Sequence, residues 1–424
     1  MSRNLVYALI ISFCLCTGAF AAGVANNTIG LQESERCSFV GIANDSSSVA
    51  HNPAGLTNIP EGKFDAEVCV LYNFTKFTYE DTTGREHVSD EPIILPSVFA
   101  AKSMGNIAFG FGVYCANGTG EMKYSNVPLI MSLSGNNINT STDVHGETYS
   151  LCFSPAIAYK ILPNLSLGLT IETFYGKSYA KYVVDTLDVP MSGGNMKTDE
   201  KTDGFGGVDA KLGLFAKLTN ELSLGLLIKT PAKLKTKGTR KTEYNSVLEA
   251  LPLPEPLRDK KEDVKITERV PWYFMSGIGY KFLSNLDASL DFGYRLWSKY
   301  QKTVKVAGAE EASSSVNTNT LKDAYVVGCG VKYGIISDLN VTAGFMYVPT
   351  AKRDKDVKFA ETDFDQTLTS LSVAYKVIQE FEIHLGCSYV HSIDKRDVPA
   401  GNLGGGGKVD SNTIYILGGV RGVF

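Results

Sequence analysis

The sequence has little net charge, no long hydrophobic run in its interior and no patterned cysteines, and each absence excludes a class of protein. The 424 residues carry a formal net charge of −4, which argues against a nucleic-acid-binding protein with a basic face. Beyond residue 22 no run reaches the roughly 18 apolar residues that a membrane-spanning helix needs. The cysteines are far apart and form no CxxC pair, so neither a zinc site nor a dense disulfide framework is indicated.

Signs of catalysis are equally scarce. The five histidines show no metal-ligand spacing, and no serine lies in a GxSxG setting. Gly404–Gly407 has no strand-to-helix context that would bind a phosphate. We therefore predict no enzyme activity, no metal site and no cofactor.

The first residues indicate export. Arg3 precedes an apolar stretch from Leu5 to Phe20, and Ala19-Phe20-Ala21 is a small-x-small cleavage site. This arrangement is typical of a secretory signal peptide. We expect residues 1–21 to be removed, with a retained membrane anchor as the less favoured alternative.

The remaining chain alternates apolar and polar residues with the period of two that is typical of β-strands. Between Leu286 and Leu296, for example, one face carries Leu290 and the other carries Ser289 and Asp291. Leu385 lies on the corresponding apolar face of a later strand. We predict that the apolar faces contact lipid, so arginine at Leu290 or Leu385 costs roughly 2 to 4 kcal/mol near the midplane. Arginine at Ser289 should be mild.

A short hairpin theme recurs along the chain: a strand ending in lysine, a tight polar turn, and a strand beginning with leucine or phenylalanine. Six short turns near residues 105, 163, 220, 285, 338 and 379 alternate with longer polar connections. The connections predicted as loops are residues 82–92, 117–146, 182–204, 235–270, 300–323, 349–367 and 392–411. The pattern predicts an all-β, transmembrane antiparallel β-barrel of about 14 strands over residues 62–424, since outer-membrane barrels alternate short periplasmic turns with long external loops. Both termini are then periplasmic; a soluble β-sandwich is the alternative.

The last strand supports closure of the barrel. Apolar residues alternate from Ile414 to Phe424, and the final residue is aromatic. Such a strand resembles the signal that the barrel-assembly machinery reads. Lipid cannot hydrogen-bond an open sheet edge, so the first and last strands are expected to pair.

Residues 22–61 do not alternate and are predicted to be separate from the barrel, either hanging in the periplasm or plugging the lumen. With the barrel pattern, this segment resembles the FadL/TodX family of outer-membrane transporters for long-chain fatty acids and hydrophobic hydrocarbons. The residues that carry the resemblance are Asn52-Pro53-Ala54-Gly55-Leu56, Asn44-Asp45-Ser46, Pro155–Lys160, Val270-Pro271, Trp297-Ser298-Lys299 and Leu321–Tyr325. Val24–Cys37 departs from the usual opening of the family.

The resemblance implies a 14-stranded barrel with an N-terminal hatch in the lumen, formed around Asn52, Pro53, Ala54 and Gly55. It also implies uptake of a long-chain fatty acid or another hydrophobic small molecule, with release sideways into outer-membrane lipid beside a kinked strand. A non-specific porin-like channel or a surface adhesin on the same barrel is the alternative.

Two groups of residues are candidates for ligand contact. Apolar residues in the external connections, some with the spacing of a short amphipathic helix, are candidates for a first binding groove: Leu129, Ile130, Val247, Leu248, Leu251 and Leu253. Packing of these residues on one another is the alternative. Phe174, Lys229, Arg295 and Arg421 face the lumen by strand parity, although a barrel arginine more often pairs with an acid such as Asp291.

Overall fold

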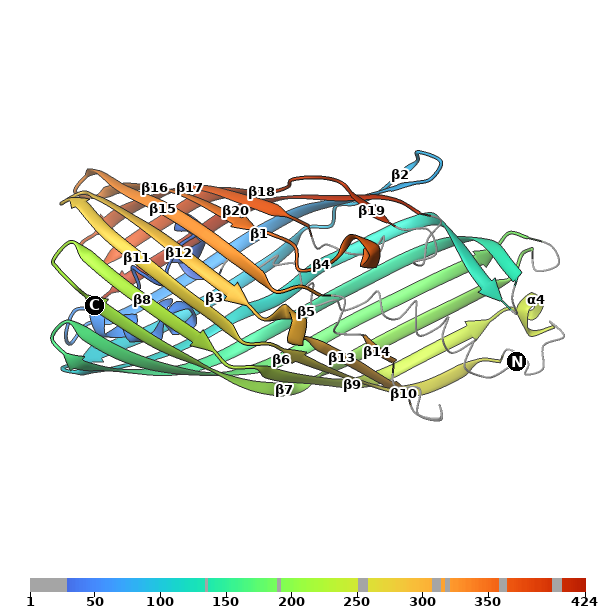
Figure 1. Ribbon diagram of the computed structural model, residues 1–424, viewed down its shortest axis with the longest axis horizontal. Helices are drawn as coiled ribbons and strands as arrows, with labels where there is room; N and C mark the ends of the chain where they lie inside the picture. The colour runs from blue at the N-terminus through green and yellow to red at the C-terminus, as the bar shows by residue number, and fades with distance from the viewer. Residues whose placement is uncertain are drawn as a thin grey trace.

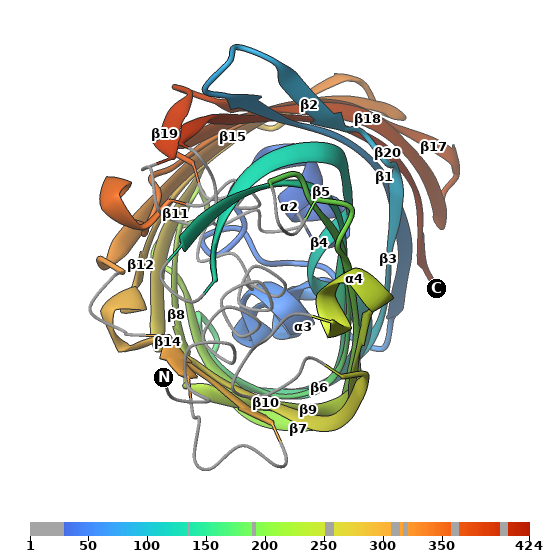
Figure 2. The ribbon, with the colours of Figure 1, turned by 90° about the vertical axis from the view of Figure 1, so that its right-hand side faces the viewer.

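The computed structural model describes residues 29–133, 136–188, 192–250, 258–306, 314–316, 321–357, 364–398 and 406–424. The strands form one elongated, closed antiparallel barrel around the N-terminal segment (Figures 1 and 2). Of the helices in these ranges, none has the length and apolar character to cross a bilayer.

Fourteen strands make up the wall, as the sequence predicts. In chain order they are β1 (Phe64–Asp81), β3 (Ile93–Met104), β4 (Ile107–Leu133), β5 (Asn136–Leu162), β6 (Leu165–Thr186), β7 (Asn195–Lys217), β8 (Leu222–Lys229), β11 (Tyr273–Leu283), β12 (Leu286–Arg295), β15 (Ala324–Ile336), β16 (Leu339–Val348), β17 (Gln366–Ile378), β18 (Phe381–Ser392) and β20 (Gly407–Val423).

The barrel closes where the last strand meets the first. β20 pairs with β1 over 17 positions, from Asp65 opposite Val423 to Asp81 opposite Gly407. The backbone N–H of Phe64 donates to the carbonyl of Phe424, and the N–H of Phe424 donates back to Phe64. The closed 14-stranded fold with a hatch in its lumen is therefore confirmed.

The outward faces are apolar, as strand parity predicts. Leu290 and Leu385 are 51% and 63% exposed on the outer surface, whereas Ser289 and Asp291 are buried inside. Exposed aromatic residues gather near both ends of this band, which is the girdle arrangement of outer-membrane barrels. Tyr159, Tyr280, Tyr333 and Tyr375 lie toward the short turns, and Trp272, Tyr294, Tyr325 and Tyr389 lie toward the other end.

Several connections that the sequence analysis assigns to loops are strands, so those loop predictions are wrong. β4 ends at Leu133 and β5 begins at Asn136. β6 continues to Thr186, and β7 begins at Asn195. Beyond the band that faces lipid, the inward side chains of these hairpins are apolar, such as Tyr124 and Tyr182, and the outward ones are largely polar. The pattern of a lipid-facing strand is therefore reversed, although the ladder continues. Further short elements lie at this end: β2 (Glu86–Ser89), β9 (Ala232–Tyr244), α4 (Ser246–Glu249), β10 (Lys260–Val270), η2 (Trp297–Lys299), β13 (Gln301–Val306), β14 (Ser314–Val316), η4 (Asp354–Asp356) and β19 (Arg396–Val398).

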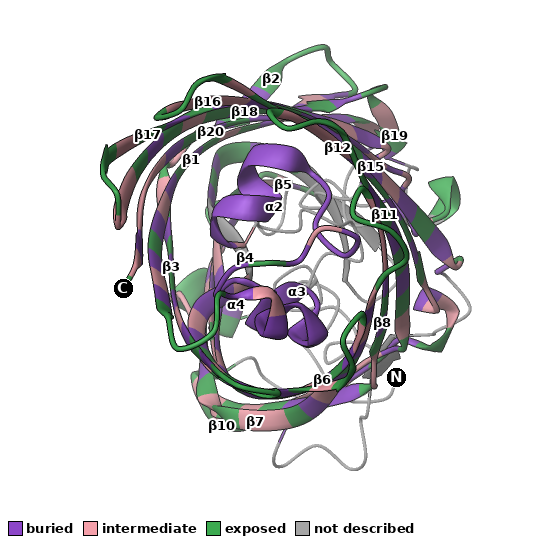
Figure 3. Ribbon diagram, turned by 90° about the vertical axis from the view of Figure 1, so that its left-hand side faces the viewer, coloured by how far each residue is buried: buried purple, intermediate pink, exposed green. Residues whose placement is uncertain are grey.

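The N-terminal segment lies inside the barrel at the short-turn end. It contains α2 (Gly30–Arg36), α3 (Ser48–His51) and η1 (Pro53–Asn58), and nearly all of its residues are buried. Figure 3 shows the two helices enclosed by the wall on all sides. We call residues 29–60 the hatch.

Candidate functional site

The Asn52-Pro53-Ala54-Gly55 motif fixes the hatch to the wall. Asn52 caps η1, since its Oδ1 accepts a hydrogen bond from the N–H of Ala54, and proline suits the first position of such a turn. The Asn52 amide donates to the carbonyl of Val40 and to that of Leu214 on β7, each at 3.1 Å. The side chain therefore joins two parts of the hatch to the barrel.

Glycines on the inner wall make this close contact possible. Gly168, Gly213 and Gly225 lie on β6, β7 and β8, and a Cβ on Gly213 would come within 2.1 Å of Asn52 Oδ1. A Cβ on Gly225 would come within 1.9 Å of the Val40 carbonyl oxygen. Glycine in a strand often marks such a backbone approach. The same close approach recurs around the barrel, and we call the whole set the glycine belt: Gly168, Gly213, Gly225, Gly277, Gly279, Gly328, Gly330 and Gly344.

Asp291 anchors the hatch two strands farther along the wall, on β12, in the same row as Gly225 and Gly277. Its carboxylate accepts hydrogen bonds from the backbone N–H groups of Phe39 at 2.6 Å, Val40 at 2.8 Å and Gly41 at 3.4 Å. From the sequence, a luminal arginine is expected to pair with this acid. Instead, the guanidinium of Arg295 lies 4.3 Å from the ring centroid of Tyr273, a cation–π contact.

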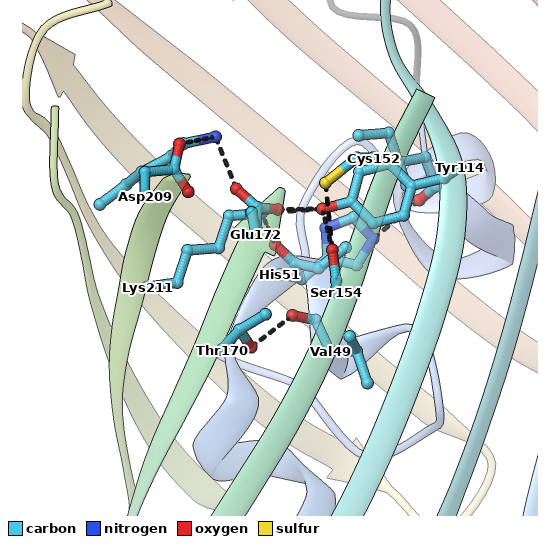
Figure 4. A network of polar contacts seen from close by, with 12 residues as sticks. Val49, His51, Tyr114, Cys152, Ser154, Thr170, Glu172, Asp209 and Lys211 are labelled. Carbon is cyan, nitrogen blue, oxygen red and sulfur yellow. Dashed lines mark hydrogen bonds and ion pairs between the residues drawn. The ribbon is translucent and has the colours of Figure 1, made fainter. Parts of the chain in front are cut away.

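A cluster of charged residues lies on the inner wall beside the hatch (Figure 4). Glu172 Oε1 lies 2.7 Å from Lys211 Nζ and accepts a hydrogen bond from Tyr114, and Glu172 Oε2 lies 2.7 Å from Lys229 Nζ. Lys229 also lies 3.2 Å from Asp209. Two acids and two lysines balance one another, so the cluster presents no surplus positive charge. We call these four residues the luminal charge cluster.

The luminal charge cluster also contacts the hatch directly. Lys211 Nζ donates to the carbonyl of Ala50 at 2.5 Å, and Thr170 donates to the carbonyl of Val49 at 2.8 Å. These carbonyls belong to the end of α3, which is too short to satisfy them itself. The strand parity of Glu172, Asp209 and Lys211 places them inside, but sequence reasoning missed them because their partners are distant in the chain.

The hatch contains its own buried titratable pair. His51 Nδ1 lies 3.8 Å from Glu33 Oε2, and His51 Nε2 contacts the carbonyl of Ile29 at 2.7 Å. Burial raises the pKa of Glu33 from 4.5 to about 7. Burial also lowers the pKa of His51 from 6.5 to about 3. In mildly acidic solution both side chains are therefore neutral, which suits a pair with no access to water.

Beyond the hatch, Phe174 lines a small apolar space. Its ring lies 5.4 Å from Lys229 Nζ, and it faces a cavity of about 30 Å³ between β6, β9 and β10. Leu234 and Ile266 form further apolar walls, and the buried Lys302–Glu268 ion pair at 3.1 Å lies on one side. The apolar cluster of Phe174 and Leu234 continues down to hatch residues such as Val49, Leu56 and Ile59.

The other luminal candidates lie apart from this space. Lys229 belongs to the luminal charge cluster. Arg421 lies on the short-turn side of the hatch, where its guanidinium contacts Asp65 at 2.5 Å. A polar cavity of about 930 Å³ occupies this mouth, and charged residues line it, including Glu35, Arg36, Asp287, Lys332, His384 and Arg421.

The external candidates are only partly brought together. Leu248 of α4 is buried among apolar residues at the far end of the barrel, and Val247 beside it is 36% exposed. Leu129 and Ile130 lie in β4, opposite Thr140 and Asn139, rather than in a loop. Leu251 and Leu253 are outside the described residues. We call the apolar set around Leu248 the mouth cluster: Phe77, Tyr79, Met122, Tyr124, Val127, Val144, Ala180, Tyr182, Val184, Met196, Leu248, Val357, Phe364, Val398 and Val409.

The wall ladder is interrupted between β3 and β4. Ser97 opposite Tyr114 is the last pair of that ladder, and beyond it residues 93–96 pair only with β1. β4 continues beside β5 with register shifts between Cys115 and Asn117, between Gly118 and Gly120, and between Tyr124 and Val127. Ala116 of this bulged stretch packs in the same apolar cluster as Ile29 at the start of the hatch.

No group of three His, Cys, Asp or Glu side chains within the described ranges is placed to hold a metal ion. The six cysteines described there are all free thiols: Cys37, Cys69, Cys115, Cys152, Cys329 and Cys387.

Comparison with known proteins agrees with this architecture. The chain is similar in fold to a Pseudomonas aeruginosa FadL homologue, with a TM-score of 0.75 and 17% identity over 93% of this chain and 98% of that one. It is also similar to the Pseudomonas putida toluene transporter TodX, with a TM-score of 0.68 and 14% identity over 95% and 99% of the two chains. The Ralstonia pickettii toluene transporter TbuX gives a TM-score of 0.67 and 16% identity over 94% and 99%.

No curated protein matches the sequence. A family model does match, and it covers residues 13–408, which is nearly the whole chain. The chain belongs to the family described as outer membrane protein transport protein (OMPP1/FadL/TodX), and it is an outer-membrane β-barrel transporter of hydrophobic compounds.

Proposed function

We propose that this barrel takes up long-chain fatty acids or similar apolar compounds from outside the cell and releases them sideways into the membrane. The observation that carries this proposal is the contrast between the two sides of the hatch. Apolar residues run along the inner wall from the hatch to Leu234, whereas the cavity on the short-turn side is lined by charges. Binding of an apolar ligand is therefore favourable down to the hatch and unfavourable beyond it.

In the proposed orientation both termini and the short turns are periplasmic, and the mouth cluster is the first apolar surface that a ligand meets. Val247, Leu248 and their neighbours, together with Leu129 and Ile130, remain the candidates for this first groove. Lipid would surround the aromatic girdles, and the barrel-assembly machinery would insert the chain. We infer no catalytic role for any residue.

We also propose that the lumen recognises the apolar part of its ligand rather than a carboxylate. Lys229 is paired with two acids and Arg421 with one, while Arg295 lies over an aromatic ring. Phe174 and the small cavity beside it are then the inner contact. Burial contributes about 0.8 kcal/mol per methylene, so a long alkyl chain supplies enough free energy without a charged contact.

A binding measurement tests both points. The purified protein is titrated with a fluorescent long-chain fatty acid, and the matching long-chain alcohol competes with it. We expect both to bind with affinities within about threefold of each other. A much weaker alcohol would contradict recognition through the alkyl chain alone. Absence of binding, together with steady ion conductance in planar bilayers, would instead support the porin-like alternative.

The interruption between β3 and β4 is the proposed exit, and a disulfide tests it. Leu95→Cys would place a thiol in the same apolar cluster as the native Cys115, across the interruption. Cys37 and Cys69, which lie in the same cluster, are first changed to alanine, and the exposed Cys329 and Cys387 to serine. Oxidation should stop uptake and reduction should restore it. Cysteines at Val98 and Val113, which already pair in the ladder, serve as the control and should leave uptake unchanged when oxidised. Normal uptake through the oxidised Leu95→Cys barrel would exclude this exit.

A further inference from the structure

The outer surface of the barrel carries a group of cations just beyond the external aromatic girdle. They lie on three neighbouring strands, and the strand alternation that buries Leu234, Ile266 and Val304 inside points these residues outward. All six side chains are exposed. We call them the cationic patch: Lys233, Lys235 and Lys237 on β9, Lys265 and Arg269 on β10, and Lys305 on β13.

The register of the sheet brings these cations directly opposite one another. Lys237 pairs with Lys265, and Lys265 pairs with Lys305, so three lysines form one row across three strands. Lys233 lies opposite Arg269 in a second row. Like charges at directly opposed positions destabilise a sheet, because their side chains are close neighbours.

The protein itself does not neutralise this group. Within the part of the chain that the structure describes, none of the six cations forms an ion pair. The nearest acids on the same face are Asp203, opposite Lys237, and Asp263, opposite Thr239. The patch therefore keeps a surplus of positive charge, although the whole chain has a net charge of −4.

Three other exposed lysines at this end of the barrel are paired. Lys123 lies 3.1 Å from Glu91, and Lys395 lies 3.1 Å from Glu80. Lys241, on the same strand as three patch residues, pairs with Glu243. The patch differs from these three positions in that its lysines face other cations in a row rather than a nearby acid.

The distance of the cationic patch from the aromatic girdle indicates which layer of the membrane lies beside it. Arg269 is three residues from the exposed girdle residue Trp272, and Lys265 is seven residues away. At about 3.3 Å per residue along a strand tilted by about 40°, the patch extends from roughly 7 to 18 Å beyond the girdle. This depth exceeds the headgroup layer of a simple phospholipid, which is roughly 5 to 8 Å thick on each side of the bilayer. A headgroup made of phosphorylated sugars spans it.

We propose that the cationic patch binds the phosphate groups of phosphorylated glycolipids in the outer leaflet. The inference rests on the proposed orientation, with the long hairpins outside the cell. Phosphates between the rows offset the repulsion of the facing lysines, and basic clusters at a membrane surface attract anionic headgroups. Glycolipid bound here would also hold β9, β10 and β13 in place beside the luminal cavity that these strands line.

The test measures glycolipid binding to the full-length protein in neutral detergent by native mass spectrometry. The probe is a lipopolysaccharide with a phosphorylated inner core, and the variant is Lys237→Gln/Lys265→Gln/Lys305→Gln. Each cation near a charged membrane surface contributes roughly a factor of five in affinity, so we expect binding about a hundredfold weaker. The matched control, Lys123→Gln/Lys241→Gln/Lys395→Gln, removes the same charge and should bind within threefold of the unmodified protein.

Three results would overturn the proposal. They are unchanged affinity of the patch variant, an equal loss in the control, and equally tight binding of dephosphorylated glycolipid or of phosphatidylglycerol. Heat-modifiable migration of both variants on gels confirms that they are folded. The patch lies outside the lumen, so the patch variant should still bind the fluorescent fatty acid. A failure of fatty-acid binding in the unmodified protein would count against the transport proposal and leave the glycolipid result standing.

Discussion

Asn52 of the hatch and Leu214 of the barrel wall are joined by a hydrogen bond of 3.1 Å from a side-chain amide to a backbone carbonyl. The same amide reaches Val40, and its oxygen caps η1. Asn52 is fully buried, so removing its side chain leaves these backbone groups without partners. Each such loss costs about 1 to 3 kcal/mol.

Asn52→Ala should therefore loosen the hatch without opening the barrel. We expect frequent current steps in planar bilayers where the unmodified protein is closed, with unchanged heat-modifiable migration. Asn220→Ala, in an exposed short turn, is the control and should remain closed. A closed Asn52→Ala barrel would show that the hatch is held by other contacts.

The glycine belt makes a second, steric prediction. A Cβ on Gly213 would lie 2.1 Å from Asn52 Oδ1, whereas a Cβ on Gly418 meets nothing within 4 Å. Gly213→Ala should expose the hatch to a soluble protease and lower the free energy of unfolding by about 1 to 3 kcal/mol, the usual effect of overpacking. Gly418→Ala should do neither. Equal protease resistance of the two variants would contradict the direct backbone contact.

Lipid exposure makes a third prediction. Arginine at Leu290 should cost about 2 to 4 kcal/mol in denaturant unfolding from lipid bilayers, because the side chain enters the hydrocarbon. Thr239→Arg is the control, since Thr239 is also exposed on the outer face but lies beyond the girdle. A similar cost at both positions would mean that Leu290 does not face the bilayer.

The earlier expectation that Ser289→Arg is mild is wrong. Ser289 is buried, and its hydroxyl lies 2.5 Å from that of Ser38 in the hatch. Arginine at this position would displace the hatch although it touches no lipid. Parity correctly predicts which face a residue occupies, but not what fills the space in front of it.

The buried Glu33–His51 pair makes the fourth prediction, which concerns pH. The pKa of Glu33 is raised to about 7, so the unfolded chain loses this proton first and folding stability falls as pH rises from 4.5 to about 7. The pKa of His51 is lowered to about 3, so stability falls as pH drops from 6.5 toward 3. The pH dependences that Glu33 and His51 impose on folding stability oppose each other between pH 4.5 and 6.5. A variant that removes one of the two titrating groups is needed to separate them.

Glu33→Gln isolates the carboxyl contribution, since the amide oxygen still accepts the hydrogen bond from Ile29. Relative to the unmodified protein, this variant should gain roughly 1.4 kcal/mol of stability per pH unit between pH 4.5 and 7, and nothing further above pH 7. Denaturant unfolding at several pH values measures the difference. A difference that does not change with pH would show that Glu33 titrates normally.

The sequence was sufficient for the fold wherever one face of a strand touches lipid. Alternation around Leu290 and Leu385 specifies both strand and orientation, and all six short turns lie where the polar residues predict them. It failed in the long hairpins of β4 to β7, where the apolar alternation is reversed: inward residues such as Tyr182 and Val184 are apolar, and the outward residues are largely polar. A search for strands with an apolar face toward lipid does not recognise them.

The site was harder to predict because it depends on contacts between distant residues. The Asn52 motif is visible in the sequence, but its partner Leu214 is 162 residues away. Gly168, Gly213 and Gly225 look like unrelated strand glycines until the register places Gly168 opposite Gly213 and Gly225 two residues away, all in contact with the hatch. Likewise Lys211 and Glu172 alternate correctly, but nothing in the sequence reveals that they pair.

The close fit between hatch and wall also constrains how the protein is assembled in the cell. Backbone lies against backbone along the glycine belt, so residues 29–60 fit the lumen with little space to spare. We expect the seam joining Phe64 to Phe424 to be sealed last, around a segment that was synthesised first. Biogenesis would then be a wrapping process, in which the sheet closes around the hatch.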